Sequence, residues 1–129
     1  MNNIKKFRNF LFESVQDAIN SLTKEYGEIF KPTDISIFDG YKFKIGNTKS
    51  TSRGLAWDGI LYKNDTAVTA VKNHGDGSAV VFYPKNKSLY AEFENDSERA
   101  FPKDPEPTTT FIMVLDYADN DGAIANDNI

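Results

Sequence analysis

The stretch that decides the fold is Leu55–Asn73, which reads Leu-Ala-Trp-Asp-Gly-Ile-Leu-Tyr-Lys-Asn-Asp-Thr-Ala-Val-Thr-Ala-Val-Lys-Asn. Its two halves, 55–63 and 66–73, are rich in apolar, aromatic and β-branched residues, as strands are. Between them lies Asn64-Asp65, and both of these residue types favour tight turns. The pattern predicts a β-hairpin and therefore an antiparallel sheet.

The sequence on either side of this hairpin predicts further strands of the same sheet. Asp39-Gly40 lies between alternating apolar segments, which is a strong hairpin signal, and Asn73-His74-Gly75-Asp76-Gly77 predicts a reversal in which Gly75 and Gly77 take positive φ angles. The expected elements are strands at 35–38 and 41–45, a polar loop at 46–52, the hairpin at 55–73, and a strand at 78–83 closed by Pro84. Together they make a meander of four or five strands.

The N-terminal region has a different period. Apolar residues recur at three- and four-residue steps at Ile4, Phe7, Leu11, Val15, Ala18, Leu22 and Tyr26. This spacing predicts one amphipathic helix from about Asn3 to Tyr26, and Gly27 favours its end. The expected fold class is α+β, with this N-terminal helix packed on a small, mostly antiparallel β-meander.

The C-terminal third is less regular. Residues 88–101 fit a short helix or a strand, and 102–107, with three prolines, predict an extended connector. The run 111–117 is rich in branched apolar residues, which favours a last buried strand over a short helix. Residues 119–129 predict a flexible acidic tail, so that the folded domain spans 14–118.

Composition excludes several kinds of site. The chain has 129 residues, no cysteine and one histidine, which excludes disulfides and makes a structural zinc site unexpected. Asp39, Asp58 and Asp76 lack the spacing and the terminal glutamate of an EF-hand, and Gly75-Asp76-Gly77 lacks the lysine of a P-loop, so we expect no other metal and no cofactor. No run of about 18 apolar residues exists, so no membrane-spanning helix is expected. No set of acid, base and nucleophile accompanies His74. We therefore expect no catalytic residues and no enzyme.

Charge is distributed unevenly along the chain. Residues 1–85 hold 12 basic and 9 acidic side chains, a net charge of +3, whereas residues 86–129 hold 3 basic and 10 acidic ones, a net charge of −7. We expect either ordinary solvated faces or an acidic surface, with Glu92 and Glu94, that competes for a basic groove of a partner.

The first thirteen residues carry a resemblance. Met1–Glu13 is short, basic and aromatic, and it ends in Leu11-Phe12-Glu13 after Phe7 and Phe10. It resembles the capsid-targeting leader of internal proteins from large T-even-type tailed phages, which ends at an aliphatic-x-Glu site. The resemblance implies cleavage after Glu13 by a prohead protease, and a protein found in the virion interior and then in the host cytoplasm. The alternative is that residues 1–13 are simply the first turns of the helix.

A second resemblance covers Trp57–Tyr83. The order of strand, Asn64-Asp65 turn, strand and then Asn73-His74-Gly75-Asp76-Gly77 is similar to that of small, functionally unassigned phage and plasmid proteins. The resemblance implies a backbone arrangement and no particular activity.

The remaining candidates are residues that could bind a partner. Aromatic side chains dominate protein-binding hot spots, and with interleaved lysines they also form stacking platforms for single-stranded nucleic acid. The candidate partner-binding residues are Trp57, Tyr62, His74, Asp76, Tyr83, Glu92 and Glu94, and the lysines of the meander are Lys42, Lys44, Lys63 and Lys72.

The resemblance to phage internal proteins gives the favoured function. We expect a virion-packaged protein, delivered with the DNA, that binds and inhibits a host defence protein such as a restriction nuclease. One alternative is a non-packaged phage or plasmid protein that modulates a host factor. The other is a single-stranded nucleic-acid-binding module, which the net negative charge of the whole chain disfavours.

Overall fold

The structure is a computed structural model that describes residues 15–124. It combines helices with a four-stranded antiparallel sheet, which confirms the α+β class. In chain order the elements are the helical segment 15–26, η1 (Glu28–Phe30), η2 (Ile35–Phe38), β1 (Tyr41–Thr51), β2 (Gly54–Lys63), β3 (Thr66–Asn73), β4 (Val81–Pro84), α2 (Lys87–Ala100) and α3 (Pro107–Asn120), where η marks a 3-10 helix.

The central hairpin is confirmed. Strands β2 and β3 pair antiparallel, with Lys63 opposite Thr66 across the two-residue turn. Asn64 and Asp65 both adopt left-handed backbone angles, with φ of 47° and 68°. Such a turn twists in the same sense as the strands it joins, which is why it suits a short hairpin. The sheet order is β1-β2-β3-β4, a simple meander.

The prediction of a first hairpin around Asp39-Gly40 is wrong. Residues Ile35–Phe38 form the 3-10 helix η2, whose start is capped by the Asp34 carboxylate accepting the Ser36 amide at 2.9 Å. Phe38 is buried and stacks on Phe111 at 4.2 Å between ring centroids, so this apolar segment serves the core without joining the sheet. The sheet begins only at β1.

The loop predicted at 46–52 is also wrong, because β1 continues to Thr51 and turns into β2 at 52–53. Polar residues can extend a strand here because this end of β1 is exposed and needs no apolar face. The strand expected at 78–83 is shorter and lies at Val81–Pro84.

The C-terminal third forms two helices. Residues left open between helix and strand form α2, whose N-cap Asn86 accepts the Leu89 amide at 3.0 Å. The strand predicted at 111–117 is wrong, because it lies within α3, and Pro107 of the expected connector opens that helix. Most of α3 from Thr110 to Ala118 is buried, and a helix buried on nearly every side shows no amphipathic period.

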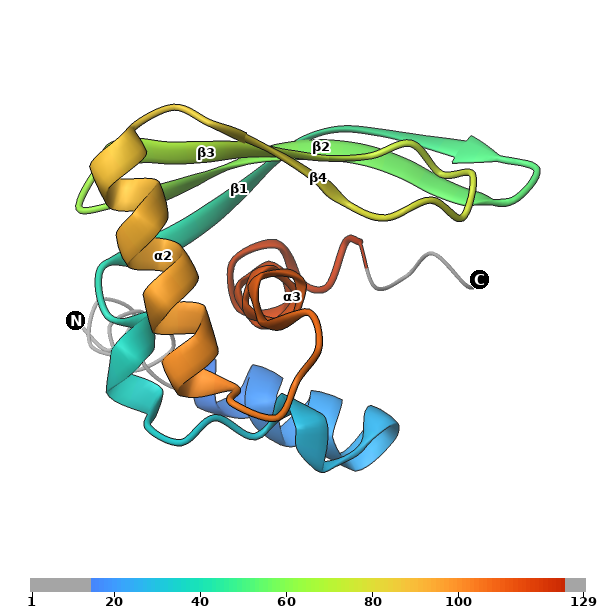
Figure 1. Cartoon of the computed structure of the whole chain (residues 1–129). Helices are drawn as coiled ribbons and strands as arrows, with labels where there is room; N and C mark the ends of the chain where they lie inside the picture. Colours follow the sequence, from blue (N-terminus) through green and yellow to red (C-terminus); the bar gives the residue numbers. More distant parts are fainter. Residues whose placement is uncertain (1–14, 125–129) are drawn as a thin grey trace, which may run out of the picture.

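The elements form layers, which Figure 1 shows with the sheet seen almost edge-on. Helix α3 packs under the sheet against β1, and α2 crosses beside it and contacts β3. The described turns of the N-terminal helix, residues 15–26, lie on the side of α3 away from the sheet. Their buried residues Ala18, Ile19 and Leu22 join the common core. Helix α3 therefore lies between these described turns and the sheet, and the first turns of the expected helix lie outside the described residues.

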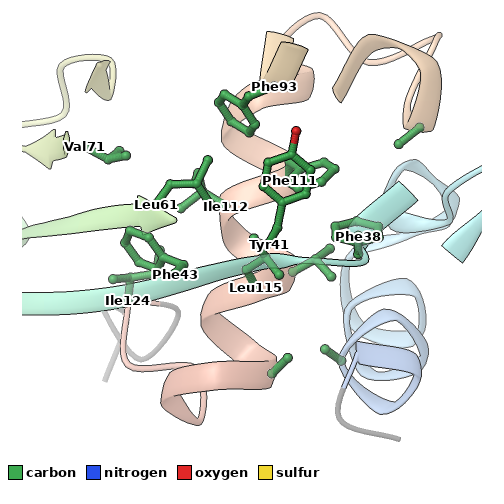
Figure 2. Packing of buried hydrophobic residues seen from close by; sticks show 14 of the residues in the cluster. Phe38, Tyr41, Phe43, Leu61, Val71, Phe93, Phe111, Ile112, Leu115 and Ile124 are labelled. Atoms are coloured by element: carbon green, nitrogen blue, oxygen red, sulfur yellow. The ribbon is translucent and has the colours of Figure 1, made fainter. Parts of the chain in front are cut away.

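Aromatic rings dominate the core. Phe111 of α3 lies at its centre, edge-on to Tyr41 at 5.1 Å and to Phe93 at 5.5 Å between centroids. Figure 2 shows these rings beside Phe38 and the aliphatic residues Leu61 and Ile112. One cluster thus joins β1, β2, α2, α3 and η2.

Residues 119–124 pack against β1, so the domain extends past the expected boundary at 118. The Asp119 carboxylate accepts the Phe43 amide at 3.0 Å, and the Asn120 side chain donates to the Phe43 carbonyl at 2.9 Å. These side chains take the place of a neighbouring strand along the free edge of β1, which protects it from unwanted pairing. Ile124 is buried. The described part of the expected tail is therefore structural.

Candidate functional site

Strand alternation divides the sheet into two faces. Phe43, Leu61 and Val71 are buried against the helices, and their strand neighbours project the other way. We call this second side the outer face. Its residues are Lys42, Lys44 and Lys49 on β1, Ala56, Asp58, Ile60 and Tyr62 on β2, Ala70 and Lys72 on β3, and Val81 and Tyr83 on β4. Within residues 15–124 no helix lies over it (Figure 1).

The centre of the outer face is apolar. Ile60, Ala70 and Tyr83 lie opposite one another across β2, β3 and β4. Tyr83 is 48% exposed. The other large hydrophobic residues exposed in the described chain are Tyr26, at the end of the helical segment 15–26, and Ile29 of η1. Val81 and Tyr62, both partly exposed, extend the apolar centre. Apolar surface of this kind is available for a partner.

A β-bulge gathers lysines around this centre. Lys44 and Lys49 are five residues apart, so on a regular strand they would project to opposite faces. The register of β1 shifts between Ile45 and Thr48, which brings Lys49 opposite Ala56 and therefore onto the outer face with Lys42 and Lys44.

Asp58 of β2 holds the bulge. Its carboxylate accepts the Asn47 amide at 2.9 Å and lies directly over Gly46, where a Cβ atom would come within 2.3 Å of Oδ1. This geometry thus needs both a glycine at 46 and a short carboxylate at 58. The face of the sheet from which Lys49 projects depends on these two residues.

No lysine of the outer face forms an ion pair in the described chain. The ion pairs formed among residues 15–124 involve only Lys63 and Arg99, both of which pair with α2. Lys42, Lys44, Lys49 and Lys72 are exposed. One carboxylate, Asp58, lies among them on the outer face, and Lys42 also interacts electrostatically with Asp119 at the edge of β1. The outer face is therefore an apolar centre with a basic rim.

The predicted aromatic residues divide between the two faces. Tyr62 and Tyr83 lie on the outer face, whereas Trp57 is 7% exposed and contacts Phe43 edge-on in the core, at 6.0 Å between ring centroids. Trp57 and Tyr62 are five residues apart on one regular strand, so alternation separates them. The structure therefore gives Trp57 a place in the core, and the expectation of one exposed aromatic set is wrong for that residue.

His74 and Asp76 lie in the turn after β3 and are exposed. Gly75 and Gly77 have φ angles of 75° and 87°, which confirms the predicted reversal. The Asp76 carboxylate accepts the hydroxyl and the backbone amide of Ser78, and these bonds lower the pKa of Asp76. Asp76 therefore has a local structural part in shaping the turn.

Glu92 and Glu94 lie on α2, away from the outer face. Glu92 pairs with Lys63 of β2, and the Lys63 ammonium also lies 3.6 Å from Asp96 and 4.6 Å from the centre of the Tyr41 ring. The Tyr41 hydroxyl donates to Asp96 at 2.7 Å, and burial, together with this bond, raises the pKa of Tyr41 far above its ordinary value. This network ties α2 to β1 and β2.

Glu94 is exposed on α2. The acidic residues predicted for partner binding are thus on the helical side, and the structure does not bring them together with Tyr62 and Tyr83. Of the basic rim, Lys42, Lys44 and Lys72 were already named from the sequence, whereas Lys49 was missed because its face depends on a bulge. The apolar residues Ile60 and Val81 were missed too, although two-residue alternation from Tyr62 and Tyr83 would have found them.

A hollow of about 190 Å³ adjoins the basic rim. It is lined by 47–49 of β1, 56–58 of β2, and Lys72 and Asn73 of β3 with His74 of the following turn. Lys49, Ala56, Asp58 and Lys72 belong to the outer face, so the hollow opens there. We call it the Ala56 hollow. It contains the predicted residue His74. A larger hollow of about 460 Å³ lies between the helical segment 15–26 and the connector to η2.

The remaining expectations concern the leader, membrane-spanning helices and metal sites. The leader residues Phe7, Phe10, Leu11 and Glu13 lie outside the described residues. No helix within 15–124 is long and apolar enough to cross a membrane. That same part of the chain contains no cluster of three histidine, aspartate or glutamate side chains suited to a metal ion. Comparison of the chain with protein-family models, curated proteins and solved structures finds no match.

Proposed function

We propose that this protein acts by contact alone and binds one macromolecular partner through the outer face of its sheet. In the setting that the leader resemblance implies, it is an internal protein of a phage capsid that enters the host with the DNA. Its partner is then a host defence protein such as a restriction nuclease, which it inhibits by covering a functional surface. Such a role needs no catalytic group and no cofactor.

The observation that supports this proposal is the apolar centre of the outer face with its rim of unpaired lysines. An apolar core inside a polar rim is the common anatomy of protein interfaces, and tyrosine is enriched among the residues that carry most of the binding energy. The rim favours an acidic partner surface because complementary charge speeds association and rejects wrong partners. The expectation from the sequence combined the sheet aromatics with the acidic half of the chain. The proposal keeps the aromatic residues Tyr62 and Tyr83 and assigns the charged contact to the basic rim.

The test compares two tyrosines of matched exposure. Tyr83 on the outer face is 48% exposed and Tyr26 near η1 is 44% exposed. The tagged full chain should capture the same host protein, identified by mass spectrometry, as wild type and as Tyr26→Ala. The affinity of Tyr83→Ala for that protein should be at least about tenfold weaker, as for a hot-spot residue. Equal loss with both variants, or loss with Tyr26→Ala alone, would rule out the outer face.

The virion setting has its own test. Mass spectrometry of purified virions should find this protein with Ser14 as its N-terminus if a protease cuts after Glu13. A chain that is absent from virions would favour the non-packaged protein that modulates a host factor from the cytoplasm. In either setting, inhibition of the captured host enzyme by the purified protein is the direct measure of function.

A second candidate function is binding of single-stranded nucleic acid. The observation that favours it is the joint placement of Tyr62, Tyr83 and the lysines on one sheet face, because bases stack on aromatic rings while lysines follow the phosphates. Trp57, buried in the core, is no longer part of this candidate. Binding of a fluorescent oligothymidylate that weakens steeply with salt and with Tyr83→Ala would support it, and no binding at low salt would remove it.

A further inference from the structure

Asp58 is the only acidic residue of the outer face, and it lies among the lysines of the rim. In the register of the sheet it is directly opposite Lys72 of β3, and it lines the Ala56 hollow together with Lys49 and Lys72. On the other side of Asp58, the bulge of β1 separates Lys44 from Lys49. A lysine therefore lies across from Asp58 on β3, and one lies on either side of the bulge on β1.

The bulge fixes the position of this carboxylate. The Oδ1 atom of Asp58 accepts the Asn47 amide at 2.9 Å, and a Cβ atom on Gly46 would lie 2.3 Å from the same oxygen. The Oδ2 atom is 3.5 Å from the Asn47 side-chain nitrogen, a long distance for a hydrogen bond, and Asp58 forms no ion pair within residues 15–124. A carboxylate accepts about four hydrogen bonds, so its charge and most of its acceptor capacity remain available to a partner.

A nucleic acid would meet this carboxylate on crossing the rim. Every nucleotide carries a phosphate, so a strand that follows the lysines brings negative charge to each point of its path. A strand that uses Lys72 on β3 and a lysine on β1 has to pass β2, where Asp58 lies between them. Two like charges about 5 Å apart in water repel each other enough to weaken binding about fourfold.

A protein surface can fit the same pattern of charge. Its carboxylates and its hydrogen-bond donors are separate side chains, so acidic groups can face the lysines while an amide, a hydroxyl or a cationic group faces Asp58. Apolar side chains of the same partner can cover Ile60, Ala70 and Tyr83, which form the neighbouring row of the outer face. A repulsive group that disfavours the wrong class of partner is a common source of specificity.

We propose that Asp58 determines which class of partner the outer face binds. It favours a protein surface that places carboxylates against the lysines and a hydrogen-bond donor against Asp58, and it disfavours nucleic acid. This inference rests on the proposed function, because it names the chemistry of the partner that the outer face binds. It gives the carboxylate a role beyond holding the bulge.

The test removes the charge of Asp58 and keeps its hydrogen bond. In Asp58→Asn the side-chain oxygen can still accept the Asn47 amide, so hydrogen exchange of that amide should stay as slow as in wild type. The affinity for a fluorescent oligothymidylate is measured at low salt with the full chain. The matched control is Glu98→Gln, which makes the same change of net charge at an exposed position on α2. Asp58→Asn should bind the oligothymidylate at least about fourfold more tightly than wild type, and Glu98→Gln should equal wild type.

A second measurement needs no variant. In an NMR titration of the wild-type chain with the oligothymidylate, the amides of 57–59 and 71–73 should show no saturable shift, because the carboxylate keeps the phosphates away from this row. The host protein captured by the wild-type chain completes the comparison. Its affinity for Asp58→Asn should fall about twofold to fivefold, the range for an exposed charge contact, while the affinity for the oligothymidylate rises.

Several results would overturn the inference. They are an oligothymidylate affinity that Asp58→Asn leaves unchanged or that Glu98→Gln raises equally, saturable shifts at 57–59 in the wild-type chain, and a host-protein affinity that Asp58→Asn does not lower. The proposed function fails separately, if Tyr83→Ala captures the host protein as well as wild type does. The oligothymidylate measurements need no host protein, so they decide the part of Asp58 by themselves.

Discussion

Replacing Tyr41 with phenylalanine tests how α2 is held to the sheet. The change removes one hydroxyl, which donates to Asp96 at 2.7 Å, and leaves the ring packed against Phe111 and Phe93. No cavity forms, so any loss of stability belongs to the hydrogen bond. Tyr41 is 4% exposed and Asp96 is 8% exposed, so water cannot easily replace the lost partner.

The size of the effect follows from the kind of bond. A buried hydrogen bond to a charged group contributes about 1.5–3 kcal/mol net. Lys63 and Arg99 remain beside the Asp96 carboxylate and moderate the loss. We therefore expect the free energy of unfolding at neutral pH to fall by about 2 kcal/mol and the melting temperature to fall by about 8 °C for a domain of this size.

Alkaline pH gives the same prediction a second readout. The pKa of Tyr41 is raised in the folded state, so its stabilising contribution is fully present below the pKa of an unfolded tyrosine, about 10, and is lost as the pH rises above it. The reason is that the unfolded chain releases the phenolic proton whereas the folded chain keeps it. The difference in unfolding free energy between wild type and Tyr41→Phe should therefore shrink between about pH 8 and about pH 10.5.

The assay is urea unfolding followed by circular dichroism at both pH values. Tyr62→Phe on the outer face is the matched control, because its hydroxyl has no hydrogen-bond partner within residues 15–124, and it should change stability by less than about 0.5 kcal/mol. The reasoning is refuted if Tyr41→Phe is as stable as Tyr62→Phe at neutral pH. It is equally refuted if the loss stays constant as the pH rises, since the hydroxyl would then not be held in its protonated form by the fold.

Three further changes test the edge, the sheet and the turn. Asn120→Ala should uncover the edge of β1 and lower the free energy of unfolding by about 1 kcal/mol. Hydrogen exchange of the Ile45 amide should become faster, because this amide loses its acceptor. Unchanged exchange would mean that the Asn120 side chain does not cap the edge. Gly59→Ala would place a Cβ atom 2.4 Å from the Phe43 ring and should lower the free energy of unfolding, measured with urea, by about 1–3 kcal/mol. A variant as stable as wild type would show that the ring moves freely. An NMR titration should find the carboxyl of Asp76 below its ordinary pKa, with Ser78→Ala moving it back up. The stabilising contribution of this group is thus present above the ordinary pKa of aspartate and disappears as the pH falls through the lowered value; a midpoint insensitive to Ser78→Ala would contradict the assignment.

The central hairpin could be read from local sequence, because its determinants are local. Asn64 and Asp65 tolerate left-handed backbone angles and the flanking residues favour extended strands, so neighbours within a few positions suffice. Gly75 and Gly77 were predictable for the same reason. The helical period of residues 15–26 also needed nothing beyond the order of residues.

The helical structure of α3 could not be predicted from the local sequence. Its residues from Phe111 to Leu115 are apolar and several are branched, which by itself favours a strand. They form a helix because the sheet, α2 and the N-terminal helix bury almost every side of it, and a segment buried all round gives no periodic signal. Likewise, Ile35–Phe38 alternates like a strand but bends into a 3-10 helix so that Phe38 can stack on Phe111.

The candidate site shows the same division. Counting residues along β2 would have separated Trp57 from Tyr62, although the two were expected on one face. The presence of Lys49 beside Lys44 on the outer face was not countable, because it depends on the bulge that Asp58 imposes on Gly46 and Asn47 from the neighbouring strand. Local chemistry therefore fixes where the chain of the central hairpin turns. Contacts between segments far apart in the chain fix which way a side chain faces and which helix covers the sheet, because burial is a property of the assembled fold.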